Sequence, residues 1–110
     1  MSGSRPDRMI RAFLDHLVVE RGTARNTVDS YARDLRRYRA HLDAAGHTDL
    51  AAVDSADVTA FVVALREGDD DHPPLAPSST GRALVAVRGL HRFAVREGYV
   101  ERDVAREVKP

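Results

Sequence analysis

Apolar residues recur every three or four positions along most of this chain, which is the spacing of one face of an α-helix. The longest example is the stretch RGTARNTVDSYARDLRRYRAHL at positions 21–42, whose apolar stripe consists of Val28, Tyr31, Leu35, Tyr38 and Leu42. No segment alternates apolar and polar residues as a half-buried strand does. The spacing therefore predicts an all-α bundle, and 110 residues are enough for one such domain.

The first two helices are expected to form a connected pair. The first is predicted from Asp7 to a stop at Gly22, with an apolar face made of Ile10, Phe13, Leu14, Leu17 and Val18. Thr23 is a suitable N-terminal cap for the second helix, and Asn26 is the alternative if that helix begins later. Gly46 is expected just beyond its end, because glycine adopts the left-handed backbone conformation found there.

Two more helices are expected in the second half of the chain. Asp54 and Asp57 resemble a capping box at the start of the third helix, which is predicted to close at Gly68. A proline-containing acidic loop, DDDHPPLAPSS at 69–79, precedes the fourth helix. That helix has an apolar stripe of Leu84, Val87, Leu90 and Ala94, with Val95 beside it.

The ends of the fourth helix are also predicted from its sequence. Ser78 or Ser79 is expected to cap its start, and Gly98 to end it, with Tyr99 or Val100 folding back as the hydrophobic partner of the turn. Three valines spaced by four residues favour one more short helix in the tail, and these are Val100, Val104 and Val108.

Composition excludes several classes of site. The chain has no cysteine, which rules out disulfides and thiolate metal sites, and its five histidines lack the paired spacing of a metal site. The run Asp69–Asp71 lacks the alternating ligands of a calcium loop and is interpreted as a solvated acidic loop. No phosphate-binding glycine loop or nucleophile motif is present. We therefore expect no catalysis, metal or cofactor, and with no signal peptide or membrane span, a cytoplasmic location.

Charge is distributed unevenly although the formal net charge is zero. Residues 21–42 carry six arginines against two aspartates, and residues 78–96 carry four arginines and no acid. Two basic segments on an otherwise acidic chain indicate one binding face for a negatively charged partner. The alternative is that both segments are ordinary solvated helix faces.

Small polar residues crowd the starts of these two basic helices, where backbone N–H groups and the helix dipole favour phosphate. Arginines are the natural contacts to phosphates, and hydroxyl and amide groups contact phosphates or base edges. The alternative is that the serines and threonines only cap the helices. The candidate DNA-binding residues are Arg25, Asn26, Thr27, Ser30, Arg33, Arg36, Ser79, Thr80, Arg82, Arg88 and Arg92.

The order and spacing of these segments resemble the core-binding domain of tyrosine recombinases, the phage-integrase family, and within it the bacterial Xer type. The resemblance begins with FLDHLVVERGTARNTVDSYARDLRRYRAHLDAAG at 13–46, and it continues with DLAAVDSADVTAFVVAL at 49–65 and SSTGRALVAVRGLHRFAVREGYV at 78–100. In the first segment the matching positions are Phe13, Leu14, Leu17, Glu20, Arg21, Gly22, Asn26, Thr27, Tyr31, Asp34, Leu35 and Leu42. The chain departs from the family pattern at Arg102 and Asp103, where Asn-Pro is usual, and in the long acidic loop.

The resemblance implies a SAM-like bundle of four to five helices that clamps one side of a recombination site with its second and fourth helices. The catalytic residues of the family lie in a separate C-terminal domain, so the tyrosines of this chain are not expected to act as the nucleophile. The implied partners are double-stranded DNA and, in a full-length protein, other recombinase protomers in a synaptic tetramer. The domain alone is expected to be a monomer, and a Xer-type role implies chromosome dimer resolution.

The expected organisation is a disordered leader at 1–6, a core-binding domain at 7–101 and the start of a linker to a catalytic domain at 102–110. A second functional interpretation remains open from the residues alone. A helical bundle with a surface rich in tyrosine and arginine also suits a protein-interaction module that docks an acidic partner.

Overall fold

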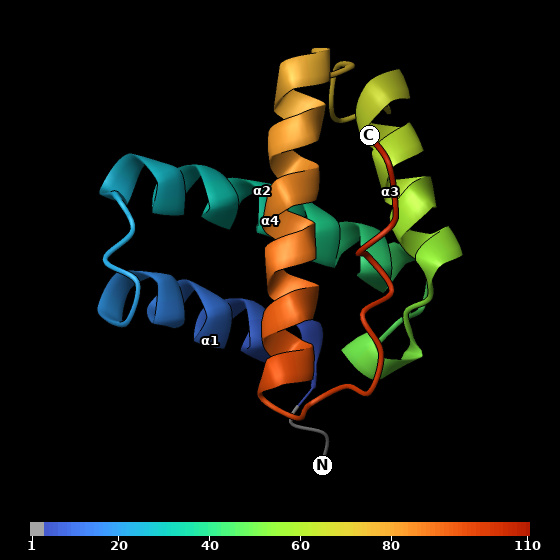
Figure 1. Ribbon diagram of the computed structural model, residues 1–110. Coiled ribbons are helices and arrows are strands. Elements are labelled where there is room, and N and C mark those ends of the chain that lie inside the picture. The colour runs from blue at the N-terminus through green and yellow to red at the C-terminus, as the bar shows by residue number, and fades with distance from the viewer. Residues whose placement is uncertain (1–3) are drawn as a thin grey trace.

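The computed structural model describes residues 4–110 and contains four α-helices and one short 3-10 helix (Figure 1). No strand occurs in this range, which confirms the all-α prediction. The elements in chain order are α1 (Pro6–Val19), α2 (Arg25–Ala44), η1 (Leu50–Ala52), α3 (Ser55–Glu67) and α4 (Pro77–Arg96).

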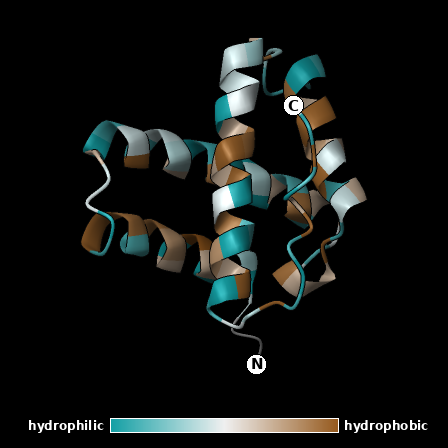
Figure 2. Cartoon of the chain, viewed as in Figure 1, coloured by the Kyte–Doolittle hydropathy of each residue, from teal (hydrophilic) through white to brown (hydrophobic). Residues whose placement is uncertain are grey.

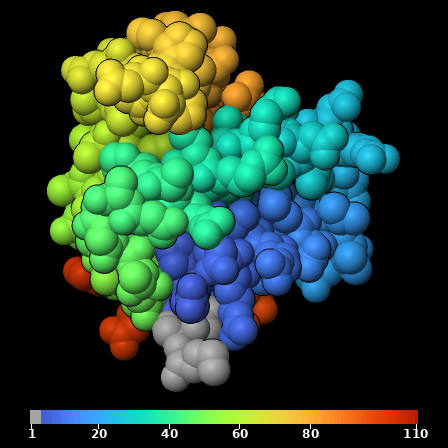
Figure 3. All heavy atoms as spheres, turned by 180° about the vertical axis from the view of Figure 1, so that it is seen from behind, coloured from blue at the N-terminus to red at the C-terminus, as the bar shows by residue number. Residues whose placement is uncertain are grey.

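The helices surround a single core. In Figure 1, α1 and α2 lie side by side as an antiparallel pair, and α4 crosses in front of them. Helix α3 packs on the other side of α4, and the C-terminal segment returns along these two helices. Seen from behind, α1 and α2 cover much of the molecule (Figure 3). This leaves the outer side of α4 facing solvent next to the α1–α2 pair.

The predicted apolar stripes form the core. On α2, Leu35, Tyr38 and Leu42 are completely buried, whereas Val28 and Tyr31 are partly buried at its edge. The stripe of α4 is also buried, and brown bands recur among paler and teal ones along that helix in Figure 2. Its members are Leu84, Val87, Leu90 and Ala94, while Val95 is partly buried. The helical periodicity of the sequence therefore identified the packed faces correctly.

The capping box at the start of α3 is confirmed. The Asp54 carboxylate accepts a hydrogen bond from the Asp57 N–H at 3.0 Å, and the Asp57 carboxylate accepts one from the Asp54 N–H at 2.9 Å. The Asp54 N–H lowers the pKa of Asp57, and a contact with His47 Nε2 at 3.0 Å lowers it further. This helix start is thus satisfied within the chain.

The caps predicted for α2 and α4 are wrong. The N-cap positions are Ala24 and Ala76, and neither helix start has a side-chain hydrogen bond to its backbone. In α4 the reason is Pro77, whose fixed φ angle suits the first position of a helix and starts it before the serines. The residues that were expected to cap are Thr23, Asn26, Ser78 and Ser79.

The predicted glycine stops of α2 and α4 are confirmed. Gly46 and Gly98 have φ angles of 84° and 78°, in the left-handed region that favours glycine. After α4, the Gly98 N–H bonds to the Val95 carbonyl and the Tyr99 N–H to the Ala94 carbonyl, which is a Schellman turn. Val100 is buried after this turn and its N–H also reaches the Ala94 carbonyl at 3.4 Å, while Tyr99 is exposed.

The two ends of the chain differ from the sequence prediction. Residues 1–3 of the predicted leader lie outside the described residues, but Ser4 is buried and its carbonyl accepts a hydrogen bond from the Leu50 N–H. The leader therefore does not extend to Pro6, which begins α1. The predicted C-terminal helix is absent, because residues 101–110 form turns that bury Ala105 and Val108.

Candidate nucleic-acid interface

A partly buried ion pair joins α2 to α4. Asp34 on α2 has a side chain that is only 7% exposed, and it accepts two hydrogen bonds of 2.9 Å from Arg82 Nε and Nη2. The Asp34 carboxylate also raises the pKa of Arg82. Such a two-point contact sets the orientation of both groups. Arg82 was predicted as a phosphate contact, and the structure instead assigns this guanidinium to the joint between the two helices.

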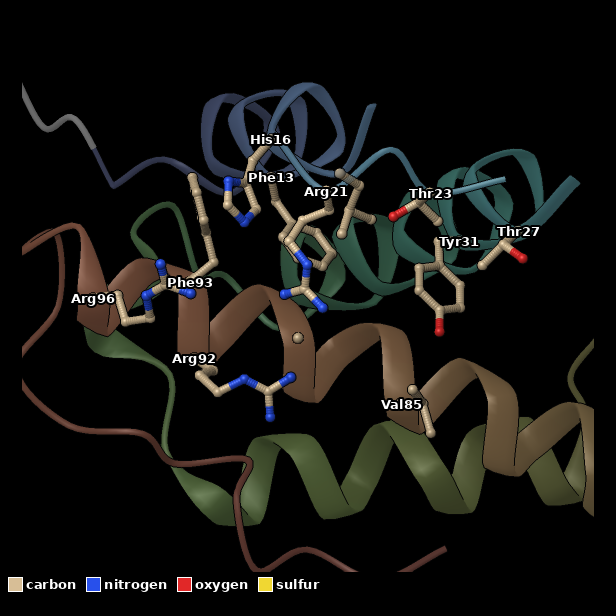
Figure 4. A pocket seen from close by; sticks show the side chains of 12 residues that line it. Phe13, His16, Arg21, Thr23, Thr27, Tyr31, Val85, Arg92, Phe93 and Arg96 are labelled. Atoms are coloured by element: carbon tan, nitrogen blue, oxygen red, sulfur yellow. The ribbon is translucent and has the colours of Figure 1, made fainter. Parts of the chain in front are cut away.

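A groove of about 190 Å³ lies between this joint and the end of α1 (Figure 4). Its floor includes Phe13 and Phe93, whose ring centroids are 5.7 Å apart. In Figure 4, the guanidinium groups of Arg21 and Arg92 extend into the groove. The remaining lining residues are His16, Leu17, Thr23, Thr27, Tyr31, Val85, Gly89 and Arg96.

The groove is positively charged. Three arginines line it, from the α1–α2 connection and from α4, and no aspartate or glutamate does. None of the three forms an ion pair with a carboxylate of residues 4–110. Clustered arginines without acid partners attract an anion of matching shape, and arginine is particularly suited to phosphate. The arginines are Arg21, Arg92 and Arg96.

The helices also differ in whether their first turns carry an acidic residue. Helices α1 and α3 carry Asp7 and Asp57 in their first turns, whereas the first turns of α2 and α4 contain no acid. These two starts also lack side-chain caps. Pro77 has no N–H and the Thr27 N–H bonds to the Ala24 carbonyl, so the groups open to an external acceptor are the N–H groups of Arg25, Asn26, Ser78 and Ser79. The positive end of each helix dipole is not offset by a carboxylate in the first turn.

The position of Asp34 shows which predicted α2 residues face α4. At about 100° per residue, Thr27 lies about 20° and Ser30 about 40° around the helix from Asp34. Asn26 and Arg33 follow at about 80° and 100°. Arg33 and Ser30 are also within 3.4 Å of each other through Nη2 and Oγ. These four residues form a polar strip beside the α2–α4 joint.

The remaining two predicted α2 residues point elsewhere. Arg36 lies about 160° from Asp34 around the helix, and Arg25 about 180°. Both side chains are exposed. They share the helix with the polar strip but not the side that meets α4, so their predicted contact with DNA would require a surface other than the groove.

The structure also separates the predicted residues of α4. Arg92 lies in the groove and Ser79 is partly buried near the helix start. Thr80 is only 1% exposed, and its hydroxyl has no hydrogen-bond partner in the described part of the chain. Arg88 donates a hydrogen bond from Nη2 to the Val108 carbonyl. Thr80 and Arg88 are therefore removed from the candidate interface, since one is buried and the other holds the C-terminal segment.

Sequence reasoning missed some residues that the fold brings to this surface. Arg21 and Thr23 precede α2 and reach the groove because the α1–α2 connection folds over it. Arg96 lies one helical turn beyond Arg92 and lines the same groove. The four-residue spacing of these two arginines was the feature of the sequence that could have identified Arg96. Arg37 lies about 60° from Asp34 around α2. Its buried Nη2 has no hydrogen-bond partner within residues 4–110.

Tyr38 and His91 form a polar contact inside the core. The Tyr38 hydroxyl and His91 Nε2 share a hydrogen bond of 2.8 Å, and both side chains are buried. Burial lowers the pKa of His91 to about 4, so its imidazole is neutral near pH 7, and it raises the pKa of Tyr38. Tyr38 is therefore a core residue, as predicted, whereas Tyr31 reaches the groove.

Two further observations concern other kinds of site. Across residues 4–110, no group of three or more histidine, aspartate or glutamate side chains is arranged to hold a metal ion. Within the same range, no helix has both the length and the apolar character needed to cross a membrane.

Comparison with known proteins identifies the family of this fold. Residues 10–98 match the family described as "Phage integrase, N-terminal SAM-like domain". The tyrosine recombinase XerD of Mycobacterium tuberculosis is 58% identical over 103 residues, covering 92% of this chain and 33% of the relative. XerD of Corynebacterium glutamicum is 46% identical over 102 residues, covering 93% of the chain and 34% of the relative.

A more distant relative agrees with these two. The tyrosine recombinase XerC of Pseudomonas aeruginosa is 37% identical over 94 residues, covering 86% of this chain and 29% of the relative. The chain thus spans about a third of the length of these recombinases, in the part that corresponds to the SAM-like domain. No solved structure gives a significant match. The chain belongs to the phage integrase family, as its N-terminal SAM-like domain.

Proposed function

We propose that this chain is the DNA-binding domain of a Xer-type tyrosine recombinase and that it holds one side of a recombination site. The observation that carries the proposal is the groove with three arginines beside the α2–α4 joint. The family and its recombinase relatives support duplex DNA as the anion that fits there.

The contacts have different roles in this proposal. Arg21, Arg92 and Arg96 neutralise phosphates along the groove, because they lack carboxylate partners among residues 4–110. The polar strip of α2 and the outer side of α4 then face base edges, since the major groove of DNA is about 12 Å wide and admits a helix. The Asp34–Arg82 pair keeps the two helices at a fixed angle during binding. Phosphate contacts position such a domain, and base contacts give it sequence preference.

Strand cleavage belongs, in this proposal, to the two thirds of a recombinase that this chain does not match. Residues 102–110 would lead toward that catalytic part, and other recombinase protomers would complete a tetramer on two sites. Chromosome dimer resolution is the role that the Xer relationship favours. A single domain is expected to bind DNA weakly and with a steep salt dependence, because its partner domain is missing from the clamp.

A duplex-DNA titration at several salt concentrations tests the proposal. The double variant Arg21→Ala/Arg92→Ala removes two groove arginines, and Arg8→Ala/Arg11→Ala removes two exposed arginines of α1 that do not line the groove. We expect the groove variant to bind several-fold more weakly at low salt. The slope of log K against log salt should fall by about one for each phosphate that is no longer neutralised.

The control variant and circular dichroism complete the test. The α1 variant should keep both the affinity and the salt slope, and all three proteins should keep the same helicity. A chain that shows no salt-dependent duplex binding would contradict DNA recognition and support an interaction module for an acidic protein partner. An equally weakened affinity in both variants would contradict the assignment of the groove.

A further inference from the structure

One apolar side chain lies on the basic outer side of α4. Val85 is 50% exposed, although most apolar residues of this helix are buried. At about 100° per residue, it lies about 60° around the helix from Arg82 and about 20° from Arg92. The valine thus sits between the α2–α4 joint and the arginines of the groove, and it lines that groove.

Within this chain, Val85 has no evident structural reason to be valine. Half of its surface faces solvent, so the core does not require it. Valine is also a weaker helix former than alanine at an exposed position, because its branched side chain loses rotamer freedom against the preceding turn. A contact outside the chain is an explanation consistent with its place on the proposed DNA-binding surface.

The chemistry of DNA limits what an apolar side chain can contact on that surface. Phosphates, sugars and base edges are largely polar, and the main apolar group on a base edge in the major groove is the C5-methyl of thymine. A valine on a groove-facing helix matches this methyl in polarity and size. Arg92 and Arg96, which line the same groove nearer the C-terminal end of α4, would hold the helix on the DNA backbone beside Val85.

We propose that Val85 contacts a thymine methyl in the major groove and gives this domain a preference for thymine at one position of its site. This inference rests on the proposed function, since it requires α4 to face DNA. It assigns to Val85 a role in sequence preference, whereas Arg92 and Arg96 act on phosphates irrespective of sequence.

Binding of the 110-residue chain to two matched duplexes tests this role. One duplex consists of alternating A·T pairs, and in the other every thymidine is replaced by deoxyuridine, which lacks only the methyl group. Burying one methyl group corresponds to about a four-fold change in affinity. We expect the chain to bind the thymidine duplex about four-fold more tightly.

The variants Val85→Ala and Val63→Ala isolate the effect. Both remove an exposed helical valine, with Val63 on α3 being 44% exposed and outside the groove. Val85→Ala should bind the two duplexes equally, while Val63→Ala should keep the preference of the original chain. Circular dichroism should show the same helicity for all three proteins.

The results separate the two proposals. Salt-dependent binding of both duplexes with equal affinity by the original chain would overturn the role of Val85 and leave DNA binding intact. A thymidine preference that survives in Val85→Ala would also overturn it. If neither duplex binds at low salt, DNA binding and the Val85 inference both fail.

Discussion

The ring of Phe13 on α1 packs against Gly89 on α4 so closely that a Cβ atom at Gly89 would lie 2.8 Å from Phe13 Cζ. Real Cβ atoms essentially never approach other heavy atoms to that distance, so a side chain at position 89 would force the Phe13 ring to shift. The same Phe13 ring forms the floor of the basic groove with Phe93. The shape of the groove therefore depends on one small residue.

Two glycine substitutions in α4 should have opposite effects on stability. Gly89→Ala is expected to destabilise the fold by about 1–2 kcal/mol, because Phe13 is buried and has little room to move. Gly81→Ala should stabilise it by about 0.5–1 kcal/mol, since a Cβ there meets no atom within 4 Å and alanine favours the helix. Urea unfolding of both variants measures the difference, and a shift of the same sign in both would contradict the steric explanation.

The Asp34–Arg82 pair should respond differently to removal of each partner. Arg82→Ala leaves the Asp34 carboxylate buried without its arginine, and we expect a decrease of about 3 kcal/mol in unfolding free energy. Asp34→Ala leaves an arginine whose side chain is 39% exposed and able to reach water, so a decrease of about 1 kcal/mol is expected. Chemical denaturation of the two variants tests this order, and equal decreases would show that burial of Asp34 does not dominate.

His91 should make the fold sensitive to acid. Its pKa is about 4 in the folded state, below the ordinary value of 6.5, so the unfolded chain binds a proton first as the pH falls. The stabilising effect is complete above about pH 6.5 and is lost as the pH falls toward 4. This difference corresponds to about 3 kcal/mol. Unfolding free energies measured from pH 7 to 4 should decrease accordingly.

The variant His91→Gln provides the control for this acid effect. It removes the titrating group, so its stability should change less with pH over the same interval. His41 also has a pKa lowered by burial and contributes in the same direction, so the comparison uses the difference between the two proteins. A His91→Gln variant as acid-sensitive as the original chain would assign the effect to other groups.

Two arginines one turn apart on α4 should separate stability from DNA binding. Arg88→Ala removes the bond to the Val108 carbonyl and should cost about 1–2 kcal/mol of stability with little change in DNA affinity. Arg92→Ala should leave stability nearly unchanged and weaken duplex binding several-fold at low salt, because Arg92 lies in the groove. Thermal unfolding measures the stability of both variants, and a titration measures the affinity of each for duplex DNA. A DNA defect in Arg88→Ala matching that of Arg92→Ala would contradict this division.

A similar comparison on α2 tests the extent of the interface. Arg33 belongs to the polar strip beside the α2–α4 joint, whereas Arg36 lies about 160° around the helix from Asp34. Both side chains are exposed, so neither alanine variant should lose helicity. We expect Arg33→Ala to weaken duplex binding at low salt and Arg36→Ala to have little effect. The reverse order in a titration would place DNA on the other side of α2.

The sequence by itself determined the helices and their buried faces, because a period of 3.6 residues fixes which side chains share a face. It also identified the capping box at Asp54 and the glycine stops at Gly46 and Gly98, since these depend on residues within one or two turns. The caps of α2 and α4 were wrong because serine and threonine near a helix start are compatible with several first positions, and Pro77 decides between them only in α4.

Only the tertiary structure decided which arginines are available to a partner. In the sequence, Arg82, Arg88 and Arg92 are equivalent positive charges on one helix. In the fold, Asp34 binds the first, the Val108 carbonyl binds the second, and the third lies in the groove. Their partners are 48 and 20 residues away along the chain. Local spacing carries no information on such distant contacts, which arise from the packing of α2 against α4 and from the return of the C-terminal segment to α4.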